Sequence, residues 1–105
     1  MREVIAQLAP GAAALTTLYD CPAQHMADVD SILVCNRSAT PAAFRVALSP
    51  AGAAIANEHY HYHDFPIDGN DTFLAALAIT MRPGDILRVY ASTANLSFNA
   101  HGDVI

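Results

Sequence analysis

The chain of 105 residues is short enough for one domain, and it is unusually poor in charge. Charged residues make up 14% of the sequence, against about 25% in typical globular domains, and hydrophobic residues make up 53%. The net charge of −5, with five arginines and no lysine, excludes the basic surface that nucleic-acid binding requires.

The sequence contains no recognisable membrane-spanning segment or signal peptide. No apolar run is long enough to span a bilayer, so we expect no membrane partner. The early Glu3 and the Pro10-Gly11 pair interrupt any signal-peptide core, which predicts that the protein is not secreted. Cys21 and Cys35 are too few for a disulfide scaffold, and we expect two free thiols.

Turn signals divide the chain at short and fairly even intervals, with about 8–12 residues between them. They lie at residues 10–11, 21–22, 36–38, 49–52, 68–71, 82–85 and 94–95. This spacing predicts one all-β domain over residues 1–105. We expect an antiparallel β-sandwich of about 7–8 strands, with a jelly-roll or immunoglobulin-like topology.

In chain order, residues 9–18 come first and are rich in alanine and leucine, which favours helix. Residues 32–35 are apolar on both faces and predict a central strand. Residues 43–48 place Phe44 and two aliphatic side chains on one face and Arg45 on the other.

The second half of the chain continues this alternation. Residues 58–64 alternate imidazole and phenol side chains, and residues 85–91 and 96–99 alternate apolar and polar side chains. Residues 73–81 fit either a two-turn helix or a strand. We favour the strand, because the segment has almost no polar face.

The closest pattern to a site is the run of His59, His61 and His63, whose side chains would share one face of a strand. A pair of them could ligate Zn²⁺, which then needs two further ligands. Asp64 would point to the opposite face, and three histidines in a row cannot bind one ion unless the strand bends. We therefore predict no metal and keep the three histidines as weak candidates. The simplest interpretation is a polar or interfacial strand face, with the tyrosines packed on the opposite face, and a pH-sensitive interface is a further alternative.

Other catalytic or ion-binding patterns are weak. The sequence contains no nucleophile elbow, dinucleotide motif or phosphate loop, so we expect no enzymatic activity and no cofactor. Cys35 lies in an apolar strand and is expected to be a buried, inert thiol. Two groups of aspartates could bind Ca²⁺, although the second is more simply a turn: Asp28 with Asp30, and Asp64 with Asp68 and Asp71.

Several stretches together resemble a known family. They are SILVCNRSATP (31–41), AGAA (51–54) with EHY (58–60), PIDGNDTF (66–73), GDILRVYAS (84–92) and LSFN (96–99). With the Leu18-Tyr19 pair they cover nearly the whole chain. They resemble short proteins and domains encoded among the virion structural genes of tailed bacteriophages and prophages. The resemblance implies a small β-sandwich that assembles in the virion and has no catalytic motif. Similar sequences more often carry apolar or tyrosine residues at positions 61 and 63.

The expected function is therefore that of a non-enzymatic virion structural protein, a capsid cement or decoration subunit or the base of a head spike. It would be assembled in the cytoplasm of the host bacterium. Its expected partners are copies of itself, with a trimer as one option, and major capsid or tail proteins. The alternatives are a tail or baseplate accessory subunit and a module that binds host-surface carbohydrate. Tyr60, Tyr62 and Tyr90 are the candidate interface or ligand residues.

Overall fold

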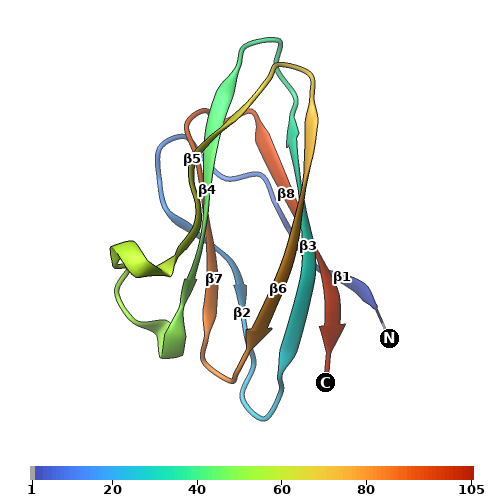
Figure 1. Ribbon diagram of the computed structural model, residues 1–105, viewed down its shortest axis with the longest axis vertical. Helices are drawn as coiled ribbons and strands as arrows, with labels where there is room; N and C mark the ends of the chain where they lie inside the picture. Colours follow the sequence, from blue (N-terminus) through green and yellow to red (C-terminus); the bar gives the residue numbers. More distant parts are fainter. Residues whose placement is uncertain (1) are drawn as a thin grey trace.

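The computed structural model describes residues 2–105, which form eight strands and two short 3-10 helices (Figure 1). The strands are β1 (Glu3–Leu8), β2 (Thr16–Asp20), β3 (Ala27–Asn36), β4 (Ala42–Ser49), β5 (Tyr60–Ile67), β6 (Thr72–Met81), β7 (Ile86–Ala91) and β8 (Leu96–Val104). The 3-10 helices η1 (Pro50–Gly52) and η2 (Asn57–His59) lie in the connection between β4 and β5. The predicted all-β class and number of strands are confirmed.

The strands form two antiparallel sheets of four, with the orders β1-β8-β3-β6 and β2-β7-β4-β5 (Figure 1). Strand β1 pairs with β8, β2 with β7, β3 with β6, and β4 with β5. The first four strands thus pair with the last four in reverse order, as in a hairpin whose tip is the β4–β5 connection. A long hairpin wrapped into two sheets in this way is a jelly roll, one of the two predicted sandwich topologies.

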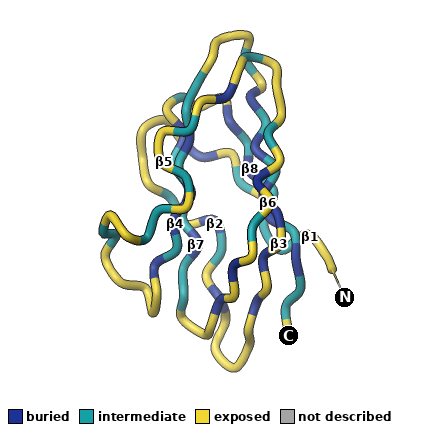
Figure 2. The backbone as a smooth tube through the Cα atoms, viewed as in Figure 1, coloured by how far each residue is buried: buried dark blue, intermediate teal, exposed yellow. Residues whose placement is uncertain are grey.

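The core lies between the two sheets, and the exposed residues gather at the connections and on the outer faces (Figure 2). Strand β7 shows the pattern that produces this arrangement: Leu87, Val89 and Ala91 are fully buried, and the residues between them are half-buried. Phe44 of β4 and Phe98 of β8 are the largest fully buried side chains, and they meet in the middle of the sandwich. The alternation seen in the sequence therefore selects the side chains that form the core.

The predicted segments are found as strands with shifted ends. Residues 32–35 lie in β3, which is central between β8 and β6. Residues 73–81 form most of strand β6 and are not helical. Residues 9–15 are irregular despite their alanine content, and the strand β2 begins only at Thr16. Ala13 has a left-handed backbone, with φ of 56°, which interrupts a right-handed helix in the middle of this segment.

Candidate functional site

Strand β5, which carries the histidines and tyrosines, is bulged where the sequence predicts regular alternation. Along β4, Phe44 is paired with Phe65 and Val46 with Tyr62, so the single Arg45 lies opposite two residues of β5. These two residues are His63 and Asp64, and Asp64 has a left-handed backbone with φ of 50°. A bulge of this kind moves the following side chains to the other face of the strand.

The bulge places Asp64 beside Arg45, which corrects the expectation that Asp64 faces away from the neighbouring histidine. The guanidinium of Arg45 donates two hydrogen bonds to the Asp64 carboxylate, at 2.7 and 3.2 Å. Its central carbon lies 4.3 Å from the centre of the Tyr90 ring. His63 lies on the other side of Asp64, with 3.6 Å between Nδ1 and the carboxylate oxygen. Arg45, Asp64, Tyr90 and His63 therefore form a polar cluster, partly exposed, that the alternation pattern did not reveal.

The three histidines do not form one row. His59 lies in η2, ahead of the strand, and its Nδ1 accepts a hydrogen bond from the backbone N–H of Ala56. His61 is exposed on β5, and His63 packs edge-on against Tyr60 with 4.8 Å between the ring centres. In the part of the chain that the structure describes, no group of three or more histidine, cysteine, aspartate or glutamate residues could hold a metal ion.

The three candidate tyrosines differ in what their rings contact. Tyr62 packs into the core against Phe44, Phe65 and Phe73, with ring centres 5.2–5.9 Å apart. One face of Tyr90 is covered by the guanidinium described above. Tyr60 is half-buried, and together with Asn57 and His63 it lines a pocket of about 280 Å³. Of the three, Tyr60 is thus the ring that remains beside an open pocket.

Asp64→Asn tests the ion pair with Arg45 through its pH dependence. The hydrogen bonds from Arg45 lower the pKa of Asp64 below its ordinary value. Because the folded pKa is depressed, the pair stabilises the fold above the unfolded pKa of about 3.9, and this contribution is lost as the pH falls through the lower folded value. In thermal unfolding, Asp64→Asn should have a lower Tm than the parent at neutral pH, and this difference should shrink as the pH falls below about 4. Asp68→Asn, a matched exposed carboxylate, should not show this convergence, and a constant difference for Asp64→Asn would contradict the role of the pair.

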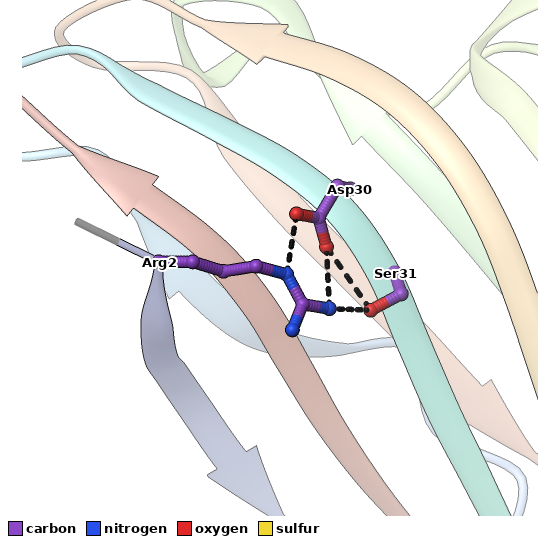
Figure 3. Close-up of polar contacts among 3 residues, drawn as sticks. All are labelled: Arg2, Asp30 and Ser31. Carbon is purple, nitrogen blue, oxygen red and sulfur yellow. Dashed lines mark hydrogen bonds and ion pairs between the residues drawn. The ribbon is translucent and has the colours of Figure 1, made fainter.

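A second polar cluster lies at a bulge in β3, where Asp30 is an extra residue relative to β8. The guanidinium of Arg2 donates to both carboxylate oxygens of Asp30, at 2.6 and 2.9 Å, and to the Ser31 hydroxyl at 3.0 Å (Figure 3). These contacts lower the pKa of Asp30 and connect the start of the chain to β3 across β8. Asp28 and Asp103 are directly opposite each other on β3 and β8 and line the adjacent pocket of about 370 Å³. The acidic residues suggested as Ca²⁺ ligands are therefore partly neutralised by Arg2.

Both cysteines are free thiols, as predicted. Cys35 was expected to be buried but is only half-buried on β3, whereas Cys21 is buried. Burial raises the pKa of the Cys21 thiol, which makes the reactive thiolate scarce.

The edges of the two sheets differ strongly in how they are protected. Within residues 2–105, the sheets end in the edge strands β1, β6, β2 and β5. Natural edge strands avoid pairing with other chains through charges, prolines, bulges or short length. Strand β1 has a bulge and begins at Glu3, β2 has five residues and a bulge and ends at Asp20, and β5 has two bulges, Asp64 and Pro66.

Strand β6 has almost none of this protection. Its ten residues include no charged residue and no proline, and Leu74 is 58% exposed. It has one irregularity, where Asp30 of β3 lies opposite both Leu77 and Ala78, but exposed side chains still alternate with covered ones along the whole strand. We call the five exposed side chains the outer row: Thr72, Leu74, Ala76, Ala78 and Thr80. The uncharged run was visible in the sequence, but its position at an edge was not.

Comparisons with protein-family models, with curated proteins and with solved structures found no match. No helix among the described residues is both long and apolar enough to cross a membrane.

Proposed function

We propose that this chain is a non-enzymatic structural subunit of a bacteriophage virion, a capsid cement or decoration protein or the base of a head spike. It stabilises the particle through contacts with neighbouring subunits. The observation that carries this proposal is the β6 edge, which has ten residues without charge and an exposed outer row. A monomeric protein with such an edge risks aggregation, whereas a subunit that is surrounded by others uses the edge as an interface.

The size and charge of the surface support the same role. The accessible surface is 5418 Å². A standard stable interface takes about 800 Å² from each partner, so each neighbour would cover roughly one seventh of this surface. Because only 14% of the residues are charged, few ionised groups lose their hydration when neighbours cover the surface. A few neighbours can therefore cover much of the protein at a low desolvation cost.

The copy number of the protein in purified particles tests the proposal. We expect quantitative mass spectrometry of particles from a strain that encodes this chain to find it in hundreds of copies, normalised to the major capsid protein. Hundreds of copies would support the cement or decoration role, whereas a handful would exclude that role and leave the base of a head spike or the alternative tail positions. Absence of the protein from particles that contain the other structural proteins would overturn the proposed function.

A further inference from the structure

We propose that strand β6 pairs in antiparallel fashion with β6 of a second copy of this chain, so that two β1-β8-β3-β6 sheets become one continuous eight-stranded sheet. The inference rests on the proposed structural role, because it names the partner of the same edge. The free side of β6 supplies the backbone groups, since within residues 2–105 this strand is hydrogen-bonded to β3 alone. Unpaired backbone groups along an edge are a template for another strand.

Symmetry restricts the register of such a pair. Opposite side chains in an antiparallel pair lie on the same face, and two identical strands must pair about a central residue. Exposed and covered side chains alternate without interruption along β6, so the outer row of one copy must meet the outer row of the other. Registers centred on Ala76 or Leu77 pair nearly the whole strand.

The register centred on Ala76 brings complementary side chains together on the exposed face. Ala76 lies opposite its own copy, and Leu74 lies opposite Ala78, so the large side chain meets a small one. Thr72 lies opposite Thr80, a pairing that favours hydroxyl hydrogen bonds across strands. Leu74 is 58% exposed in the single chain, and this pairing would cover part of its side chain.

The covered face is equally compatible with pairing. In the same register Phe73 lies opposite Ile79, and aromatic against β-branched pairs are among the favourable ones in antiparallel sheets. Phe73 is only half-buried in the single chain, although it contacts the rings of Phe44 and Phe65 in the core. A second copy would cover the remaining exposed part of this ring.

The charges at the two ends of β6 identify a second copy as the partner. Asp71 precedes the strand and Arg82 follows it, and both are exposed. In either register Asp71 lies opposite a residue that is next to Arg82 of the second copy. The two-fold symmetry creates this proximity once at each end of the paired strands. The guanidiniums of the other four arginines all donate hydrogen bonds, whereas that of Arg82 has no partner in residues 2–105. The edge therefore carries both halves of its own ion pairs.

The first experiment places a charge at the centre of the proposed contact. Sedimentation or light scattering across a concentration series should show that the parent protein forms dimers. Ala76→Lys should weaken the dimer about tenfold or more, because two lysines then face each other across the symmetry axis. Ala12→Lys, at an exposed alanine in the β1–β2 connection, should dimerise like the parent. An unchanged Tm in dilute solution would show that both variants still fold.

A charge exchange tests the symmetry itself. Arg82→Asp and Asp71→Arg should each weaken the dimer about fivefold, because each places like charges together twice. The double variant Asp71→Arg, Arg82→Asp should restore the parent affinity within about twofold, since it recreates the ion pairs in reversed order.

Failure of this inference can be distinguished from failure of the proposed function. A parent protein that stays monomeric, or an Ala76→Lys variant that dimerises like the parent, would overturn self-pairing even if the protein is abundant in particles. Loss of Ala76→Lys from particles combined with a monomeric parent would assign β6 to a different protein and also overturn self-pairing. A β6-dependent dimer that is absent from particles would support the pairing and overturn the virion role.

Discussion

Phe44→Ala is expected to lower the free energy of unfolding by about 3–5 kcal/mol, the usual range for truncating a fully buried phenylalanine. Phe44 is fully buried, and its ring centre lies 5.6–6.2 Å from those of Tyr62, Phe65, Phe73 and Phe98. Two of these rings belong to the opposite sheet, so the cavity would open between the two layers. Urea unfolding followed by far-UV circular dichroism measures the loss.

A matched control separates this position from aromatic residues in general. Phe65→Ala removes the same atoms from a half-buried ring on the edge strand β5, so its loss of stability should be clearly smaller. If Phe44→Ala costs less than about 1 kcal/mol, Phe44 does not join the two layers as the structure indicates.

Gly102→Ala is also expected to be strongly damaging, with a loss of about 3 kcal/mol, although it adds only one methyl group. Gly102 lies on β8 opposite Val29 of β3, beside the bulge at Asp30. A Cβ atom at this position would collide with the backbone carbonyl of Asp28. Because the obstacle is the backbone of a paired strand rather than a flexible side chain, the two central strands would have to separate locally.

Gly11→Ala is the control for Gly102→Ala. No atom lies within 4 Å of a Cβ added at Gly11, so its stability should change by less than about 1 kcal/mol. Equal effects of the two substitutions would show that the close approach between β8 and β3 does not exist. The same urea titration measures both variants.

The periodic segments of the chain were predictable because a strand with one buried face alternates its side chains. The alternation in residues 43–48 predicted that Phe44 and Val46 share one face of a strand, and both are fully buried. The candidate site was less predictable. Asp64 contacts Arg45 because β5 contains an extra residue at that point, and a one-residue change in register moves each following side chain to the opposite face. Such a bulge depends on the partner strand and leaves little trace in the local pattern.

The low charge of the chain and the uncharged run at residues 72–81 are properties of the sequence alone, and so is the division into short strands between turns. The order of those strands was decided only by the tertiary structure, because it depends on contacts between residues far apart in the chain. That order places the uncharged run at the edge of a sheet, where Leu74 is exposed. In the centre of a sheet the same residues would have formed ordinary core, whereas at the edge they present an interface.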